Sequence, residues 1–294
     1  MLEIKLILCP VDFSEFSVRA YQYALSLAEH YGAKVVAQHI VELTRYPYAD
    51  YVATTGDYAE FCRALHDGAR QQLEAFLKAH GPGPTHSEFV VHEGTAPDSI
   101  LSYAEKRKAD LIVIGTHGRR GYDRLVLGSV TNRVMRRTSC PVLAICTPQQ
   151  QSAAETQKHT HQLHRVLFCT DFSENSERAF RYAVSATEEY NAELIVLHVL
   201  EEIQNSSKVQ AALATIREQL DKMIQQEIPK ALKIKTAVRV GKPYQQIIEL
   251  AEKTHTDTIV MGVRGRGAVD LAVFGSTTYR VLQLGPCPVL AVHL

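Results

Sequence analysis

The stretch that decides the fold is LIVIGTHGRRGYDRLVLGS at residues 111–129, and TIVMGVRGRGAVDLAVFGS at residues 258–276 repeats its pattern. Each copy has a short apolar run, then Gly-x-x-Gly, nine further residues and Gly-Ser. The apolar run predicts a buried strand, and the residues from Gly-Ser onward predict a helix. Glycine lets a backbone come close to a ligand, and a helix N-terminus offers free N–H groups. The pattern therefore predicts two strand–loop–helix units suited to bind phosphate.

The repetition extends to nearly the whole chain. CPVDFSEFSVRAYQYALSLAEHYGAKVVAQHIVE at residues 9–42 matches FCTDFSENSERAFRYAVSATEEYNAELIVLHVLE at residues 168–201. Residues 94–115 match residues 241–262 in the same way. Only the first half carries the Tyr-rich insertion TRYPYADYVATTGDY, which we interpret as a packing surface or a subunit contact rather than a lid. Its tyrosines are Tyr46, Tyr48, Tyr51 and Tyr58.

A length of 294 residues is typical of about two domains. The polar segment TPQQQSAAETQKHTHQ separates the halves, so we expect domains at 1–147 and 163–294 and a linker at 148–162. Alternating apolar strands and amphipathic helices predict a doubly wound α/β fold, with a parallel sheet covered on both faces. In the first half we expect strands at 5–11, 34–41, 86–94, 109–115 and 141–146, and helices at 17–32, 68–81, 96–108 and 129–138.

Composition narrows the classes of function. Lys+Arg and Asp+Glu both number 32, so the formal net charge is zero, which argues against a nucleic-acid or anionic-membrane surface. The sequence contains no run of 18 apolar residues, so no membrane span is predicted. The start, MLEIKLILCPVDF, is interpreted as a first strand rather than a secretory signal. The cysteines have no CxxC spacing, so we expect reduced core thiols in a cytosolic protein. They are Cys9, Cys62, Cys140, Cys146, Cys169 and Cys287.

One aspartate follows the first strand of each half. The carboxylates of Asp12 and Asp171 could accept hydrogen bonds from a ribose hydroxyl or an adenine amine. The competing interpretation is a turn or capping role, because Ser14 and Ser173 are good helix N-caps. Their recurrence opposite a glycine loop in both halves favours ligand contact.

The other candidate positions also recur in pairs. The hydroxyl groups after the loops could cap a helix or bind phosphate, and the loop cations could neutralise phosphate or simply be solvated. Val41 and Leu200 end the second strands, where they would form an apolar wall for a flat base. Gly94 and Gly241 either shape that pocket or only make a tight turn. The histidines inside the second strands, His39 and His198, are expected to be core residues bonded to backbone.

Taken together, VDFS and TDFS after the first strands, GTAP, GKP and the two glycine loops resemble the universal stress protein family. The resemblance covers nearly the whole chain and implies a tandem protein of two Rossmann-like domains, similar to adenine nucleotide alpha hydrolases. It implies a five-stranded parallel sheet of order 3-2-1-4-5 in each domain. It also implies that the fifth strands, in CPVLAIC and CPVLAVH, pair within the chain as a pseudo-dimer, which would cover two sheet edges.

The resemblance further implies ATP binding of the glycine-loop subclass, with Mg²⁺ as an optional companion. Residues implied for the first site are Val11, Asp12, Val41, Gly115, His117, Gly118, Arg119, Gly128, Ser129 and Val130. Those for the second site are Thr170, Asp171, Leu200, Gly262, Arg264, Gly265, Arg266, Gly275, Ser276 and Thr277. Thr170 replaces Val11 and Pro243 replaces Ala96, but neither departure removes a ligand group, so two sites are predicted. No catalytic residue and no metal ligand is predicted.

The function implied is a cytoplasmic, nucleotide-dependent regulator of a stress response. Slow ATP hydrolysis stays open, because no catalytic base can be named. The expected partners are ATP, a second copy of the chain and an unknown protein, with no nucleic acid and no membrane. A nucleotide-independent interaction module is the alternative. An ATP pyrophosphatase or nucleotidyl transferase is disfavoured, because SGGxDS, HxGH and KMSKS are absent, and the loops lack the Gly-Lys-[ST] of a P-loop.

Overall fold

The computed structural model describes residues 3–45, 58–81, 87–117, 126–146, 162–201, 206–227, 232–263 and 275–293. The first half contains β1 (Leu6–Pro10), α1 (Glu15–Tyr31), β2 (Lys34–Val41), a 3-10 helix (Leu43–Arg45), α3 (Tyr58–His80), β3 (Ser87–Glu93), α4 (Ala96–Arg107), β4 (Leu111–Gly115), α5 (Ser129–Arg137) and β5 (Val142–Ile145). The second half contains β6 (Arg165–Thr170), α6 (Glu174–Glu189), β7 (Glu193–Leu200), α7 (Ser206–Glu227), β8 (Lys233–Val240), α8 (Pro243–Lys253), β9 (Thr258–Gly262), α9 (Ser276–Leu284) and β10 (Val289–Val292).

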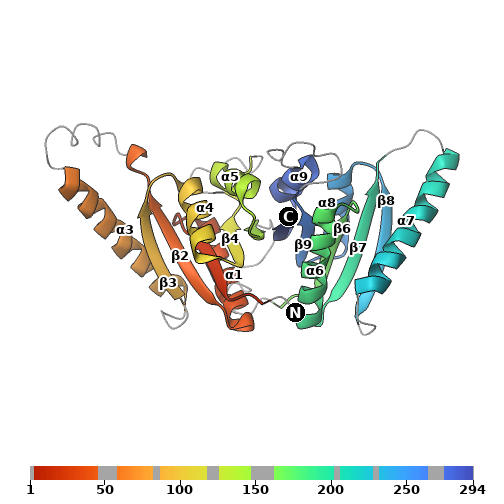
Figure 1. Ribbon diagram of the computed structural model, residues 1–294, viewed down its shortest axis with the longest axis horizontal. Helices are drawn as coiled ribbons and strands as arrows, with labels where there is room; N and C mark the ends of the chain where they lie inside the picture. The colour runs from red at the N-terminus through yellow and green to blue at the C-terminus, as the bar shows by residue number, and fades with distance from the viewer. Residues whose placement is uncertain are drawn as a thin grey trace.

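These strands form one ten-stranded sheet in the order β3-β2-β1-β4-β5-β10-β9-β6-β7-β8. Within each half the strands are parallel and follow the predicted order 3-2-1-4-5. The two halves meet where β5 pairs antiparallel with β10, with Leu143 opposite Leu290. The predicted pairing of the fifth strands is therefore observed, and it merges the two parallel sheets into one mixed sheet (Figure 1).

The helices cover both faces of the sheet but build different cores on each. On the face of α4, α5, α8 and α9, one apolar cluster runs across the junction and includes Met135 of α5 and Leu282 of α9. On the other face, α1 and α6 each cover a separate cluster, centred on Tyr21 and Phe180. Helices α5 and α9 lie on either side of the junction near the middle of the molecule (Figure 1). Burial on one face is therefore shared by the two halves.

Two buried hydrogen bonds also cross the junction. The Nε2 of His293 is 2.7 Å from the carbonyl oxygen of Met135, and the Sγ of Cys146 is 3.7 Å from that of Leu282. Because a carbonyl oxygen only accepts, the imidazole and the thiol are the donors. Cys146 follows β5 and His293 follows β10, so each half bonds to the last turns of the other half's helix.

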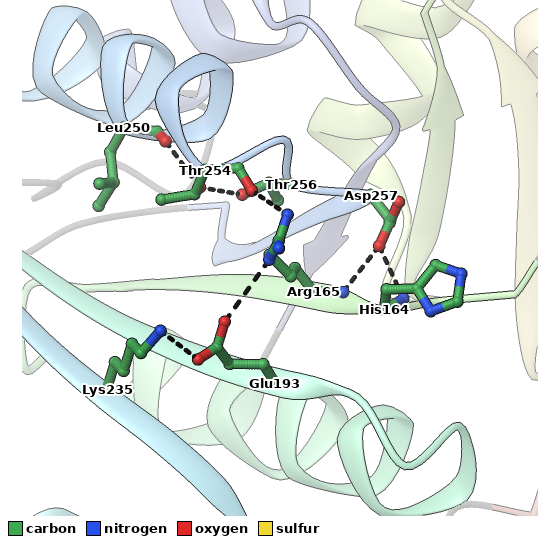
Figure 2. Close-up of polar contacts among 8 residues, drawn as sticks. All are labelled: His164, Arg165, Glu193, Lys235, Leu250, Thr254, Thr256 and Asp257. Atoms are coloured by element: carbon green, nitrogen blue, oxygen red, sulfur yellow. Dashed lines mark hydrogen bonds and ion pairs between the residues drawn. The ribbon is translucent and has the colours of Figure 1, made fainter.

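A second repeated device fixes the amino-terminal edge of the sheet. The Oδ2 of Asp257 accepts the backbone N–H groups of His164 and Arg165, both at 2.7 Å (Figure 2). Arg165 also donates from Nη1 to the carbonyl oxygen of Thr254 at 2.7 Å (Figure 2). In the first half Asp110 accepts the N–H groups of the residues at the start of β1 in the same way. This aspartate holds the start of the first strand, at the edge opposite the glycine loops.

One helix differs from its predicted bounds. Helix α3 begins at Tyr58 and not at Gly68, which lies in its interior. Nothing lies within 4 Å of where a Cβ of Gly68 would stand, so this glycine costs the helix only its intrinsic penalty of about 1 kcal/mol. The favourable flanking residues therefore continue the helix through it. Tyr58, 40% exposed, belongs to α3, while Tyr46, Tyr48 and Tyr51 and the predicted linker before Gln162 lie outside the described residues.

All six cysteines are free, and all are buried except Cys62 and Cys140, which are partly exposed. Burial raises the pKa of Cys146 to about 12, so this thiol is protonated at neutral pH. Among the described residues, no helix is both long and apolar enough to cross a membrane.

Candidate functional site

The candidate residues gather at the carboxyl-terminal ends of the central strands. Strand β1 pairs in parallel with β2 on one side and with β4 on the other, so these three strands end at one edge. Asp12, Val41 and Gly115 stand at those ends in the first half, and Asp171 and its counterparts repeat the arrangement in the second. We call these strand ends the carboxyl edge. The strand order reverses between β1 and β4, and α/β folds of this type bind ligands at such a point of the carboxyl edge.

The aspartates take part in the turn that follows the first strand. The Oδ1 of Asp12 accepts the backbone N–H of Ser14 at 3.0 Å and its hydroxyl at 2.5 Å. Asp171 repeats these bonds with Ser173 at 3.1 and 2.6 Å. Both serines cap the following helix. The turn role is therefore observed in both halves, and each aspartate is half-buried at this edge.

A histidine from β2 supports the aspartate turn of the first half. The Nδ1 of His39 is 2.7 Å from the carbonyl oxygen of Val11, and its ring centroid is 4.5 Å from that of Phe13. Phe13 has φ of 65°, a left-handed conformation that costs a non-glycine residue roughly 1–2 kcal/mol. The surrounding packing must therefore hold this residue in place.

The second half builds the same support from β7. The Nδ1 of His198 is 2.8 Å from the carbonyl oxygen of Thr170, and its ring stacks on Phe172 with centroids 4.7 Å apart. Phe172 has φ of 58°. The prediction that His39 and His198 bond to backbone is confirmed. The left-handed phenylalanines were not predicted, although the repeated Asp-Phe-Ser was a usable signal.

Packing supplies a further reason for the first glycine of each loop. A Cβ on Gly115 would stand 2.7 Å from the Cβ of Phe16, and one on Gly262 would stand 2.9 Å from the carbonyl carbon of Asn175. These distances are far below ordinary contact. Glycine is thus required where β4 and β9 pass under the first turns of α1 and α6, whether or not a ligand binds.

The last glycine of each loop, in the Gly-Ser pair, is the N-cap of a helix. Gly128 precedes α5 with φ −53° and ψ 139°, and Gly275 precedes α9 with φ −58° and ψ 130°. Because both N-caps are glycines, neither supplies a side-chain acceptor, and within the described part of the chain no other side chain accepts the first N–H groups. The N-terminus also carries a partial positive charge of about +0.5. Of the first-turn residues, Ser129 and Ser276 are exposed and Val130 and Thr277 half-buried. The helix starts can therefore receive an anion.

Two buried threonines were missed by the sequence reasoning. Thr131 donates from its hydroxyl to the carbonyl oxygen of Gly115 at 2.7 Å, and Thr278 donates to that of Gly262 at 3.0 Å. They fix the start of α5 and α9 against the ends of β4 and β9. Both stand two residues after the Gly-Ser pair, so their repetition was the available signal.

Gly94 and Gly241 form tight turns. Their φ values are 133° and 137°, which side chains rarely adopt, and their N–H groups donate to the carbonyl oxygens of Val41 at 3.1 Å and Leu200 at 2.9 Å. The turn interpretation is therefore observed.

The loop cations are only partly described. The Nδ1 of His117 hydrogen-bonds the hydroxyl of Thr116 at 2.9 Å, and its ring lies 5.1 Å from that of Phe16. The remaining predicted loop residues lie outside the described residues, and their ligand contacts stay predictions. They are Gly118, Arg119, Arg264, Gly265 and Arg266.

A cavity of about 530 Å³ lies away from this edge, at the amino-terminal ends of the strands. Lys108 and Arg137 of the first half and Arg178 and Tyr182 of the second border it. Its polar groups are of mixed charge, and none of the predicted site residues lines it. The candidate site therefore lies at the carboxyl edge, where the residues repeat in both halves, and not in this cavity.

Comparison with known proteins agrees with this two-part α/β architecture. The model of the universal stress protein family matches residues 3–145 and again residues 162–293. A universal stress protein of Methanocaldococcus jannaschii is 32% identical over 147 residues, which cover 50% of this chain and 85% of that protein. One from Mycolicibacterium smegmatis is 25% identical over 300 residues, covering 98% of this chain and 96% of that protein.

Among solved structures, a universal stress protein from Archaeoglobus fulgidus is similar with a TM-score of 0.68 at 21% identity. The match covers 98% of this chain and 96% of that one, and it shows that the fold is shared over the full length. The fold defines a tandem doubly wound α/β protein. Because the family model matches both halves, the chain belongs to the universal stress protein family.

Proposed function

We propose that each half of this chain binds one ATP at the carboxyl edge, and that the protein acts as a nucleotide-dependent regulator of a stress response. The phosphates would lie at the N-termini of α5 and α9. Asp12 and Asp171 would contact the ribose or the base, against the apolar walls at Val41 and Leu200. We further propose that the halves are separate domains, 1–147 and 163–294, and that the protein works in the cytoplasm, which suits its free thiols.

The observation that carries the proposal is the pair of uncapped helix starts. As N-caps, Gly128 and Gly275 offer no side-chain acceptor to the first N–H groups of α5 and α9, and none comes from elsewhere among the described residues. A phosphate accepts such groups and is favoured by the helix dipole. The half-buried Asp12 and Asp171 at the same edge supply acceptors for the rest of the nucleotide. The chemistry of the described residues therefore fits ATP.

One set of contacts favours the alternative of an interaction module. Asp12 and Asp171 are engaged in their own turns, and Gly115 and Gly262 are required by helix packing. These parts of the motif would persist in a chain that binds no nucleotide. The described residues give no such internal role to the glycine-capped helix starts, so they are the part of the site to test.

Proline at the first position of each helix gives a selective test. Ser129→Pro and Ser276→Pro would each delete one N–H donor and one hydroxyl. Proline is well tolerated at the first helical position, and the ψ of 139° at Gly128 and 130° at Gly275 suits a residue before proline. Ser129→Ala and Ser276→Ala are the matched controls, since they remove the hydroxyl alone.

Titration calorimetry of nucleotide-free protein with Mg-ATP measures the effect. We expect two sites per chain in the wild type, and about 10- to 100-fold weaker binding at the site that carries proline, from the loss of a hydrogen bond to a charged group. The alanine controls should lose less, with unchanged thermal melting of the free protein. A wild type that takes up no ATP would favour the interaction module. Phosphate release measured on the same samples tests slow hydrolysis separately.

A further inference from the structure

We infer that His39 and His198 are positioning residues that set the nucleotide affinity of their own half by holding the aspartate turn. The inference rests on the proposed function and adds to it residues that would not touch the ligand. Each histidine contacts both the residue before the aspartate and the residue after it.

The contact before the aspartate is a directed hydrogen bond. The Nδ1 of His39 lies 2.7 Å from the carbonyl oxygen of Val11, and the Nδ1 of His198 lies 2.8 Å from that of Thr170. A carbonyl oxygen has no proton to give, so Nδ1 carries the hydrogen in both rings. This bond fixes the peptide group that leads into Asp12 or Asp171.

The contact after the aspartate is ring packing on a strained residue. Phe13 and Phe172 have φ of 65° and 58°, which phenylalanine adopts only when its surroundings hold it there. The ring centroids of His39 and His198 lie 4.5 and 4.7 Å from them. The histidine thus supports both ends of a short turn whose middle residue is the proposed nucleotide contact.

The difference between the halves supports a backbone role. Val11 and Thr170 are chemically unlike, yet both present their carbonyl oxygen to the histidine at nearly the same distance. The hydrogen bond is made to the peptide group and does not depend on the side chain of that residue. This explains why the change from valine to threonine leaves the second turn intact.

The tandem repeat provides its own control. His39→Leu should weaken ATP binding at the first site about tenfold, through loss of a partly buried hydrogen bond, and leave the second site unchanged. His198→Leu should give the reciprocal result. His39→Asn and His198→Asn keep an N–H donor near the position of Nδ1, and we expect them to hold affinity within about threefold of wild type. Calorimetry with Mg-ATP counts the sites, and thermal melting without nucleotide verifies folding of each variant.

A second measurement needs no nucleotide. Nitrogen-15 spectra of the imidazole rings in the free protein should assign the hydrogen of His39 and His198 to Nδ1. The inference is overturned if His39→Leu keeps two sites of wild-type affinity, if asparagine fails to restore binding, or if either ring is protonated at Nε2 alone. A wild type that binds no ATP, with both rings protonated at Nδ1, would instead overturn the proposed function together with the affinity claim and leave the turn geometry standing.

Discussion

The two halves of the chain agree at one edge of the sheet, whereas at the other they share the aspartate contacts of Asp110 and Asp257 but differ in their ion pairs. At the carboxyl edge the aspartate turn, the histidine support, the glycine under a helix and the uncapped helix start all recur. At the amino edge Lys34 of β2 pairs with Glu88 of β3, whereas the second half reverses the signs with Glu193 and Lys235 (Figure 2). Arg165 joins that second pair, where the first half has Leu6.

The difference shows which requirements are strict. A cross-strand ion pair needs only opposite charges, so either order serves. The carboxyl edge depends on particular backbone positions, and these admit few residue types. The edge that repeats in detail is the edge to which we assign the nucleotide sites.

The largest effect is expected from filling the glycine positions under α1 and α6. Gly262→Ala places a Cβ 2.9 Å from backbone and Cβ atoms of Asn175, and Gly115→Ala places one 2.7 Å from the Cβ of Phe16. Each should lower the free energy of unfolding by about 3 kcal/mol, the upper end of the cost of overpacking. Urea unfolding without nucleotide is the measurement. Gly68→Ala, in open space inside α3, is the control and should stabilise by up to about 1 kcal/mol. Equal stability of Gly115→Ala and wild type would contradict the packing role.

Removing the hydrogen bonds across the junction should have the next largest effects on stability, and the two effects should be unequal. His293→Leu would leave the buried carbonyl oxygen of Met135 without its donor and cost about 1–2 kcal/mol. Cys146→Ala removes only a weak, long thiol bond to Leu282 and should cost less. Urea unfolding followed by circular dichroism compares the two. An effect of Cys146→Ala larger than that of His293→Leu would break the expected order.

Lowering the pH should destabilise the first half through a contact that the second half lacks. Buried Gln38 donates from Nε2 to the Nδ1 of His92 at 3.0 Å, and Leu197 takes the place of Gln38 in the second half. Burial, followed by the charges of Lys106 and His66, lowers the pKa of His92. The unfolded chain therefore takes up the proton first.

This contribution to stability is complete above about pH 6.5 and is lost as the pH falls below it. We expect the melting temperature of wild type to fall between pH 7 and pH 5 more steeply than that of His92→Gln, which cannot gain the charge. His255→Gln, at an exposed position in the second half, should keep the wild-type slope. Identical slopes for all three proteins would contradict the prediction.

The smallest effect concerns the ends of α1 and α6. Gly32 after α1 has φ of 64°, and Asn191 holds the matching left-handed position after α6 with φ of 50°. Glycine adopts this conformation at lower cost than asparagine. Asn191→Gly should stabilise by about 0.5 kcal/mol and Gly32→Asn should destabilise by a similar amount. The midpoints of urea unfolding test this, and a shift in the reverse direction for either variant would contradict it.

Much of the fold could be predicted because it depends on patterns along the chain. Apolar strands alternating with amphipathic helices predicted a parallel, doubly wound sheet, and the repeat of Asp12 at Asp171 aligned the halves. The strand order within each half was implied only by the family resemblance. The start of α3 was missed, since Gly68 is a poor helix former that favourable neighbours outweigh. That β5 and β10 pair was implied only by resemblance, because the pairing of two edges leaves no periodic signal.

The candidate site was predicted by residue and only partly by role. The aspartates and glycines were found, but their engagement in turns and helix contacts depends on distances between segments far apart in the sequence. The threonine bonds of Thr131 and Thr278 were missed for the same reason. Side chains that act on backbone carbonyls of another element leave no signature in a single sequence beyond their repetition.

Native mass spectrometry of the purified chain, after exposure to Mg-ATP, tests the equivalence of the two carboxyl edges most directly. Our account predicts two ATP molecules per chain, falling to one in Ser129→Pro or Ser276→Pro and to none in the double variant. A wild-type chain that carries no nucleotide, or proline variants that carry the full complement at wild-type affinity, would contradict it.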